Sequence, residues 1–491
     1  MKNIICVVGD NLQVEVSRLI NRNEARVVSI LNFSSNYIQS DDSCLVYNIE
    51  EIRRLYLDRC HEEFQIQSAF LTLEQWNEIY KQKTFFYEMS DRCAYFPLPI
   101  QDLNEFFRIF VSFWCNLFLS TKADAIVFFS TPHLPFEFVG YLVANVLEKQ
   151  IRIINRTGIQ GISKVTKDID LYNLREEPHC KVPDNNLDPM AQKNNPDNIF
   201  LSYSRSINKK ILSTQSSLVE SLRLLIIYLA RDVYRLMFKS RKYYKPTRRA
   251  SAFWMSGPEN ILSYIMEYIR TALASRKKYQ TYQKLATEDL PPKYILFTAH
   301  FQPERSTMPE GGVFSNMFDV VSKLRSVVPK DLAIVYKEHP RQFDPFSFKK
   351  RSFREHNFYQ KLKSIDGVYL ANSTTSTDDL MKNSVAISTV TGSAGFEALS
   401  AGKPVIIFGD AWYRKCRSVL HVSKLSKETL SLLLSRSFGQ VLIDLENFLS
   451  NLDGAFVLCF NTEFFRKKSD FHLEDADAVT LANYLVENLI E

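Results

Sequence analysis

The segment that favours ligand chemistry most clearly spans residues 388–399 and reads STVTGSAGFEAL. It follows an apolar run at 385–387, which predicts a buried strand, and it opens a predicted helix that Gly402, Lys403 and Pro404 close. Small residues after a strand let backbone N–H groups at a helix N-terminus approach an anion, and the helix dipole adds attraction. The segment is neither a Walker loop nor a G-x-G-x-x-G motif.

Five residues of this segment are candidate donor-binding residues: Thr391, Gly392, Ser393, Gly395 and Glu397. The first four would bring the backbone close to a phosphate, and Glu397, in about the first turn of the helix, can reach a ribose hydroxyl. An ordinary strand-to-helix turn, with Glu397 only complementing the helix dipole, explains the same spacing equally well.

A second polar group stands at the end of the apolar run 332–336, where Lys337, Glu338, His339 and Pro340 follow one another. Doubly wound sheets bind ligands outside the carboxyl ends of their strands. His339 can donate to a phosphate or protonate a leaving group, and Pro340 fixes the turn that presents it. We take His339 as a catalytic candidate and Lys337 and Glu338 as donor-binding candidates, against the alternative of a structural histidine.

The residues after the predicted strand 294–297 form a third candidate region. Gln302 and Glu304 can hydrogen-bond sugar hydroxyls, and Gly311 and Gly312 predict a flexible loop. We place Gln302 in the donor site and count Glu304 among the catalytic candidates. A plain loop with solvated polar residues is the alternative.

The fourth region follows the apolar run 125–129 and contains His133 in a proline-rich turn. At the end of a strand, His133 would be a general base for an acceptor hydroxyl. A histidine satisfied inside its own turn is the alternative, and Asp10, Asp91 and Glu137 are competing carboxylates for the same role.

Strands that alternate with helical patterns must position these groups. Apolar runs at 4–8, 27–31 and 125–129, with helical spacing at 105–119 and 138–147, predict a doubly wound α/β domain over residues 1–160. A second set of apolar runs predicts another such domain over 291–491. Residues 161–290 would form a loop and helical bridging segment, with helices near 214–238 and 258–285. Two such domains facing a cleft would bind ligands at their strand ends.

Composition limits the class of protein. The 491 residues are 45% hydrophobic and 24% charged, which excludes wholesale disorder, and a net charge of +6 is too small to argue for nucleic acid. The eight cysteines include no C-x-x-C pair, which favours free thiols in a reducing compartment. The longest apolar stretch, 106–119, is too short to span a membrane and predicts a buried helix.

A basic stretch at 239–249 carries six cations, two tyrosines and no acid. Such a stretch would contact an anionic membrane face, where each basic residue contributes about 1 kcal/mol. A solvated loop between helices explains it equally well.

Taken in order, the four polar regions resemble the bacterial capsule polysaccharide biosynthesis family. The resemblance rests on Ser130–His133, Gln302–Glu304, Lys337–Pro340 and Thr391–Leu399, spread over about residues 120–415. That family includes Kdo transferases that use CMP-Kdo as donor. The resemblance implies a GT-B architecture, with the acceptor against the N-terminal domain and the nucleotide-sugar donor in the C-terminal one.

By analogy with that family, His339 and Ser393 would contact the donor phosphate, and Lys337 would add positive charge. The resemblance implies no metal and no cofactor apart from the nucleotide-sugar substrate. Two D-x-D triplets, at 168–170 and 475–477, follow none of the buried strands of the proposed cleft and have no His cluster, so Asp168, Asp170, Asp475 and Asp477 are interpreted as solvated. It implies a cytoplasmic or peripheral membrane enzyme that transfers Kdo or a related sugar to a glycan or lipid-linked acceptor. A UDP-sugar transferase, an epimerase-like enzyme and a non-catalytic nucleotide-sugar-binding partner of the capsule machinery are the alternatives.

Overall fold

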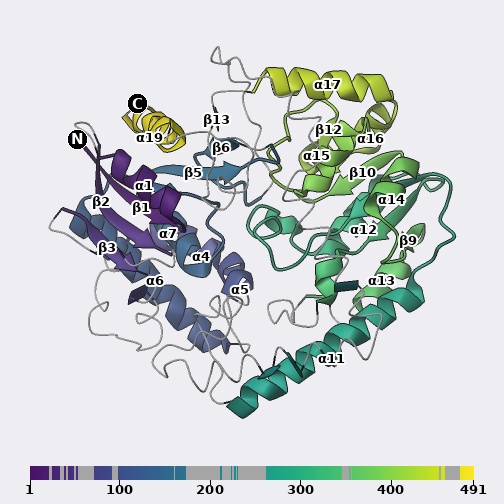
Figure 1. Cartoon of the computed structure of the whole chain (residues 1–491), viewed down its shortest axis with the longest axis horizontal. Coiled ribbons are helices and arrows are strands. Elements are labelled where there is room, and N and C mark those ends of the chain that lie inside the picture. The colour runs from purple at the N-terminus through teal and green to yellow at the C-terminus, as the bar shows by residue number, and fades with distance from the viewer. Residues whose placement is uncertain are drawn as a thin grey trace. The chain divides into compact units, whose positions relative to one another are not determined.

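The computed structural model describes most of the chain, and its described residues form two compact units, each with its own β-sheet (Figure 1). The first unit takes the described residues within 1–169 and 452–491, and the second those within 170–178 and 187–451. The described residues are 1–21, 25–33, 38–39, 43–48, 51–52, 71–90, 98–159, 161–172, 211–212, 223, 226–227, 229–230, 261–344, 353–354, 357–452, 455–458 and 476–490.

The first unit is built on a seven-stranded sheet of order β13-β6-β5-β4-β1-β2-β3. Strands β1 to β5 are parallel, as expected for apolar runs separated by helices. This confirms the first α/β sheet predicted from the sequence. The strands are β1 Lys2–Val8, β2 Ala25–Asn32, β3 Leu45–Asn48, β4 Ala125–Phe128, β5 Gln150–Arg156, β6 Ile162–Thr166 and β13 Phe456–Leu458.

Strand β6 corrects the prediction that a loop begins near residue 160. It pairs antiparallel with β5 through a turn in which Gly161 has φ +74°, a value that favours glycine. The Thr157 hydroxyl donates to the carbonyl of Ile162 at 2.9 Å and so ties this turn together. The strand escapes sequence detection because Ser163 and Lys164, both buried, interrupt its apolar pattern.

The end of the chain corrects the predicted domain over 291–491. Strand β13 joins the first sheet, and helix α19 (Ala476–Ile490) packs on the same unit. Leu481, Leu485 and Leu489 are buried in the core that β1 and β2 form. The last carbonyls of α19 accept hydrogen bonds from Arg152 and Lys2, which satisfies groups that a helix C-terminus leaves open.

Aromatic packing fills the other side of the first unit. Helix α6 (Ile100–Thr121) confirms the predicted buried helix, and its Trp114 donates to the Phe136 carbonyl at 2.9 Å. Phe136 belongs to α7 (Pro135–Val146), whose first turn follows the strand-end segment that holds His133. The other helices among the described residues of this unit are α1 Asn11–Leu19, α4 Leu73–Lys81 and α5 Lys83–Ser90.

The second unit is built on a six-stranded, fully parallel sheet of order β12-β11-β10-β7-β8-β9. In chain order this is the 3-2-1-4-5-6 arrangement of the Rossmann fold, which confirms the second doubly wound sheet. The strand order reverses between β7 and β10. The strands are β7 Tyr294–Thr298, β8 Ala333–Lys337, β9 Val368–Leu370, β10 Ala386–Thr389, β11 Val405–Ile407 and β12 Val419–His421.

Helices cover this sheet. The predicted helix at 258–285 is observed as α11 (Ile261–Leu285), and its Tyr279 and Tyr282 side chains are buried in the core. No helix among those described is long and apolar enough to cross a membrane. The other helices are α12 Met317–Val327, α13 Phe358–Lys363, α14 Thr377–Asn383, α15 Ser393–Ser400, α16 Lys427–Leu434 and α17 Phe438–Ser450, with short 3-10 turns η2 Gly312–Phe314, η3 Pro340–Phe343 and η5 Val422–Lys424.

Four cysteines lie in described residues and form no disulfide, and burial raises the pKa of three of them. Burial raises the pKa of Cys115 to about 12 and that of Cys416 to about 11, so both are structural thiols at neutral pH. Burial also raises the pKa of the Cys6 thiol, and Cys44, like the other three, is not part of a disulfide. The other four cysteines lie outside the described residues.

Candidate functional site

Loops from four neighbouring strands meet at the carboxyl edge of the second sheet. The loop after β7 contacts the end of β10, since Thr391 donates its hydroxyl to the Ser306 carbonyl at 2.8 Å. It also contacts the segment after β11, where the Asp410 N–H donates to the Glu310 carbonyl at 3.0 Å. The Gln302 N–H reaches the Gln342 side chain in η3 after β8 at 3.0 Å. These contacts surround the switch point between β7 and β10, the usual ligand site of such sheets.

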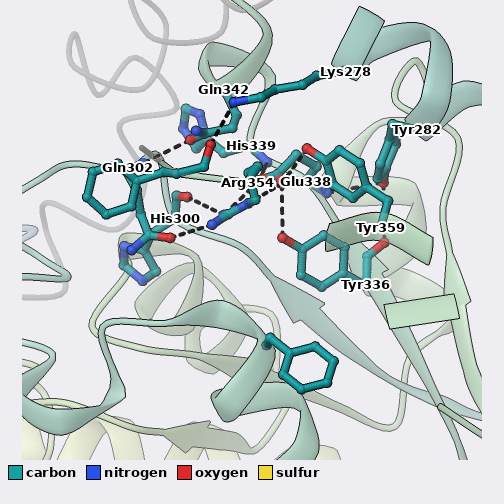
Figure 2. Close-up of polar contacts among 12 residues, drawn as sticks. Lys278, Tyr282, His300, Gln302, Tyr336, Glu338, His339, Gln342, Arg354 and Tyr359 are labelled. Atoms are coloured by element: carbon teal, nitrogen blue, oxygen red, sulfur yellow. Dashed lines mark hydrogen bonds and ion pairs between the residues drawn. The ribbon is translucent and has the colours of Figure 1, made fainter. Parts of the chain in front are cut away.

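A buried ion pair joins Arg354 to Glu338, the residue that follows β8 at this edge, as Figure 2 shows. The Arg354 guanidinium donates from Nε to Glu338 Oε2 at 2.6 Å and from Nη2 to Glu338 Oε1 at 3.2 Å. Both side chains are almost completely buried, at 2% and 0% exposure. Burial alone would lower the pKa of Arg354, and the Glu338 carboxylate overrides that effect, so the pKa is raised. Arg354 is therefore charged at neutral pH.

Tyrosines complete the hydrogen bonding of Glu338. The hydroxyls of Tyr336 and Tyr359 both donate to Oε2 at 3.0 Å, and burial raises the pKa of both phenols well above the usual value. Tyr282 accepts from the Glu338 N–H at 3.2 Å and donates to the Ala371 carbonyl at 2.7 Å. Glu338, predicted to bind the donor, is therefore held by protein groups on all sides.

Gln302 belongs to the same buried network. Its side-chain oxygen accepts from Arg354 Nη1, and its side-chain nitrogen donates to the Ser315 carbonyl. Only 2% of the residue is exposed. Gln302 thus links the loop after β7 to Arg354, and its side chain, like that of Glu338, is taken up by contacts within the protein.

His339 stands at the rim of this network with one ring nitrogen occupied. Its Nδ1 accepts the Arg341 N–H at 3.2 Å, which places the ring proton on Nε2 in the neutral form. Its backbone N–H donates to Glu338 Oε1 at 2.8 Å, and its ring lies 6.1 Å from that of Phe301. Burial and the Arg341 and Arg354 charges lower the pKa of His339 to about 3. The imidazole is therefore neutral at pH 7, with Nε2–H as its donor.

Lys337 and Glu304 differ from His339 in burial and in the groups that they contact. Lys337 is buried and donates to the carbonyls of Asn372 at 2.8 Å and Ser373 at 2.6 Å, so it anchors the segment after β9. Burial lowers the pKa of Lys337 to about 7. The Glu304 side chain is 41% exposed and lies 3.7 Å from Arg341 Nη1, beside the histidine that precedes η3.

His300 is a residue of the site that the sequence prediction did not include. Its Nε2 accepts the Thr391 N–H at 3.2 Å and lies 3.0 Å from Thr389 Oγ1, while Nδ1 lies 3.1 Å from Ser306 Oγ. Burial lowers the pKa of His300 to about 3, and repulsion from the Arg354 charge, and from His339 whenever that ring is protonated, adds to the effect, so the His300 ring is neutral. His300 fixes the backbone of Thr391 immediately before the helix N-terminus. The sequence signal that could have identified His300 is its position at the end of an apolar strand.

The glycines before and within α15 are required by close packing. A Cβ on Gly392 would lie 2.8 Å from Thr389 Oγ1 and 3.3 Å from the His300 ring, and one on Gly395 would lie 2.1 Å from the Tyr413 hydroxyl. That hydroxyl donates to the Gly392 carbonyl at 2.6 Å. The helix N-terminus is thus clamped from both sides. Its first residue, Ser393, is exposed.

Glu397 lies in the second turn of α15 rather than the first, because the helix begins at Ser393. It is half-buried. Gly311 and Gly312, predicted to form a flexible loop, lie in an ordered turn: the Gly312 N–H donates to the Pro309 carbonyl at 2.8 Å. A Cβ on Gly311 would lie 2.5 Å from the Thr307 carbonyl oxygen, so close packing is what this position requires.

His133 lies in the first unit, between β4 and α7. Its Nδ1 lies 2.9 Å from the Thr131 carbonyl, which can only accept, so the neutral ring carries its proton on Nδ1 and its lone pair on Nε2. Glu137 Oε2 lies 3.7 Å from Nδ1. Burial raises the pKa of Glu137 to about 7, against the lowering effect of hydrogen bonds from the His133 and Leu134 N–H groups. This pair has the composition of a general base and its supporting carboxylate.

Asp10 and Asp91 are the other carboxylates proposed as general base, and the structure describes only the first of them. Asp10 caps α1 by accepting the Gln13 N–H at 3.1 Å, and Asp91 lies outside the described residues. Asp170, which belongs to one of the two D-x-D triplets, pairs with Arg414 at 2.9 Å and is buried, in contrast to the solvated role predicted for it.

Within the described ranges, no three His, Cys, Asp or Glu side chains gather as a metal site. The basic stretch 239–249 also lies outside those ranges.

Comparison with known proteins adds one sequence match. Residues 235–416 match the family model described as capsule polysaccharide biosynthesis protein, which confirms the resemblance over that part of the chain. No curated protein matches the sequence.

Several solved structures match this chain at low similarity. The β-Kdo 2,7-transferase KpsC of Thermosulfurimonas dismutans is 12% identical, with a TM-score of 0.30, over 86% of this chain and 97% of its own. The UDP-GlcNAc 2-epimerase of Methanocaldococcus jannaschii is 13% identical, with a TM-score of 0.23, over 92% and 99%. The UDP-forming trehalose-phosphate synthase of Burkholderia vietnamiensis is 8% identical, with a TM-score of 0.30, over 100% and 97%. These similarities are too low to indicate a substrate.

Proposed function

We propose that this chain, whose residues 235–416 match the capsule polysaccharide biosynthesis family, is a glycosyltransferase of surface-polysaccharide biosynthesis. Its donor would be a nucleotide sugar bound at the carboxyl edge of the second sheet. In its finer form, the proposal is a GT-B enzyme that transfers Kdo or a related ulosonic acid from CMP to a glycan or lipid-linked acceptor.

The observation that carries the proposal is the pairing of a neutral histidine with a helix N-terminus at one sheet edge. His339 presents Nε2–H after β8, and α15 begins at Ser393 after β10. The His300 bond to Thr391 and the Tyr413 bond to Gly392 hold the start of that helix. Both groups offer N–H donors to an anion, and a leaving nucleotide phosphate gains negative charge in the transition state.

In the proposed reaction, an acceptor hydroxyl attacks the anomeric carbon of the donor. The new bond forms between the acceptor oxygen and that carbon, and the bond between the carbon and the phosphate oxygen breaks, so the nucleotide leaves with the electron pair. His339 Nε2–H and the N-terminus of α15 would stabilise that charge. The proton of the acceptor hydroxyl would pass to Nε2 of His133, and Glu137 would stabilise the imidazolium. Protein groups alone take these roles, so the proposal includes no metal ion.

Nucleotide binding tests the donor site without an acceptor. Titration calorimetry with CMP and with UDP should show tighter binding of CMP, and His339→Ala should weaken it. If UDP binds and CMP does not, the CMP assignment is wrong and a UDP-sugar transferase or an epimerase-like enzyme replaces it. If CMP binds but no nucleotide sugar is consumed with any acceptor extract, the protein is a nucleotide-sugar-binding partner and not a transferase.

A further inference from the structure

The Arg354 guanidinium is fully occupied by contacts within the protein. Nε donates to Glu338, Nη1 to the Gln302 side chain, and Nη2 to both Glu338 and the His300 carbonyl. Its Cζ also lies 4.8 Å from the centre of the Phe358 ring. With 2% of its side chain exposed, it has no nitrogen turned to solvent or to a ligand. Figure 2 shows the guanidinium between the two groups of acceptors.

These acceptors come from the ends of two adjacent strands. His300 and Gln302 follow β7, and Glu338 follows β8. A buried ion pair is a poor source of stability, because the loss of hydration of both charges offsets their attraction. What a bidentate Arg–carboxylate pair does supply is a fixed geometry, since the planar guanidinium fork matches the two carboxylate oxygens. Arg354 therefore fixes the position of the segment after β8 relative to the segment after β7.

The fixed geometry extends to His339 through one further bond. Glu338 Oε1, which accepts from Arg354 Nη2, also accepts the His339 N–H at 2.8 Å. The backbone of His339 is thus attached to the carboxylate that Arg354 holds in place. Two hydrogen bonds separate the guanidinium from the histidine that would face the donor phosphate.

We propose that Arg354 is a positioning residue that sets the orientation of His339 through Glu338 and does not itself touch the substrate. The kinetic part of this proposal rests on the proposed function. Lysine keeps the charge but cannot donate to Glu338, Gln302 and His300 together, because its single ammonium lacks the guanidinium fork. Arg354→Lys therefore leaves the charge and removes the alignment.

The kinetic test is a double-mutant cycle between Arg354→Lys and His339→Ala on nucleotide-sugar turnover. Arg354→Lys should lower kcat about 100-fold, the scale expected for misplacement of a reacting group, with less than a threefold change in KM. In the His339→Ala background the same substitution should cost less than threefold. Equal losses in both backgrounds would overturn the proposal, because Arg354 would then act independently of His339.

A matched control separates positioning from general stability. Arg325 also bridges carbonyls of its own unit, donating to the Leu332 carbonyl at 2.8 Å and to those of Val328 and Pro329, and it lies outside the site. Arg325→Lys should change the free energy of unfolding and leave kcat within threefold. If both Arg→Lys variants lower kcat alike, the positioning role is refuted. Should Arg354→Lys fail to fold, Glu338→Gln takes its place in the cycle, with the same expected and opposing results.

A readout without turnover keeps this proposal distinct from the proposed function. In ¹⁵N-histidine spectra, with His339 assigned by His339→Gln, the wild type should show a single neutral ring state protonated at Nε2. Arg354→Lys should move both ring nitrogens toward the averaged shifts of a mobile imidazole. Unchanged shifts would overturn the proposal. If the wild type consumes no nucleotide sugar, the proposed function fails and this spectrum alone decides the role of Arg354.

Discussion

Arg354 Nε lies 2.6 Å from Glu338 Oε2, and the two side chains are exposed by only 2% and 0%. The pair lies at the carboxyl edge of a parallel sheet, beside the strand switch point where doubly wound folds bind ligands. Both the Arg354 guanidinium and the Glu338 carboxylate are hydrogen-bonded there by other groups of the protein.

Arg354→Met tests how far that pair depends on both members. The substitution leaves the Glu338 carboxylate buried with two tyrosine donors and without its hydrogen-bonded cation, so we expect a loss of about 3–5 kcal/mol in the free energy of unfolding. Urea denaturation of the two proteins measures it. A loss below about 1 kcal/mol would mean that the carboxylate finds water or another cation, against the observed burial.

His339→Ala tests the proposed phosphate donor. Because the ring is neutral and donates from Nε2, its loss should lower kcat about 100- to 1,000-fold, as for removal of one oxyanion donor. Circular dichroism should show an unchanged fold, since the Nδ1 bond to Arg341 is a local contact within one short turn. An unchanged rate would remove His339 from the phosphate role.

Gly395→Ala tests the clamp on the helix N-terminus. The new Cβ would lie 2.1 Å from the Tyr413 hydroxyl, so we expect a loss of about 1–3 kcal/mol in stability and weaker nucleotide binding. Tyr413→Phe in the same chain should recover part of the stability, because the hydroxyl is the nearest clashing atom. Gly439→Ala is the matched control: nothing lies within 4 Å of its Cβ, and alanine there should stabilise α17. Equal effects at both glycines would contradict the clamp.

Glu137 predicts a pH dependence of stability. Its pKa is raised to about 7 in the folded protein from an ordinary 4.5, so the folded state binds the proton more tightly than the unfolded state. Its contribution therefore favours folding below about pH 4.5 and is lost as the pH rises through 7. Glu137→Gln should gain stability relative to the wild type between pH 5 and 8. Urea midpoints at pH 5 and at pH 8 measure this difference. His133→Gln, introduced into the wild type and into Glu137→Gln, removes the nearest titrating neighbour. A constant difference across that range would show that Glu137 is ionised in the fold.

Metal removal tests the electrostatic part of the proposal. Because protein N–H donors are proposed to stabilise the leaving phosphate, dialysis against EDTA should leave the rate unchanged. Turnover with and without added Mg²⁺ or Mn²⁺ measures it. A loss of rate with EDTA that either ion restores would assign the charge to a metal instead.

The sequence predicts the sheets well because buried parallel strands appear as short apolar runs. The runs at 294–297 and 332–336 correspond to β7 and β8, and the polar residues after them do lie at one sheet edge. Helix α6 is equally clear, since its apolar residues recur at helical spacing over many turns.

Three features escape such reasoning for separate physical reasons. Strand β6 carries a buried lysine and serine in place of apolar residues, and α19 returns to the first unit by packing that no local pattern encodes. Arg354 follows Lys349, Lys350 and Arg351 in a stretch that looks like a solvated basic run. Only its partners reveal it, because Glu338 lies 16 residues away and Gln302 lies 52 away.

Turnover of CMP-Kdo by the purified protein with an acceptor extract tests the proposed function most directly. We expect acceptor-dependent release of CMP that His339→Ala slows about 100- to 1,000-fold, and no turnover of UDP-sugars. Consumption of a UDP-sugar in place of CMP-Kdo would contradict the donor assignment. No consumption of any nucleotide sugar by a folded protein would contradict the transferase itself.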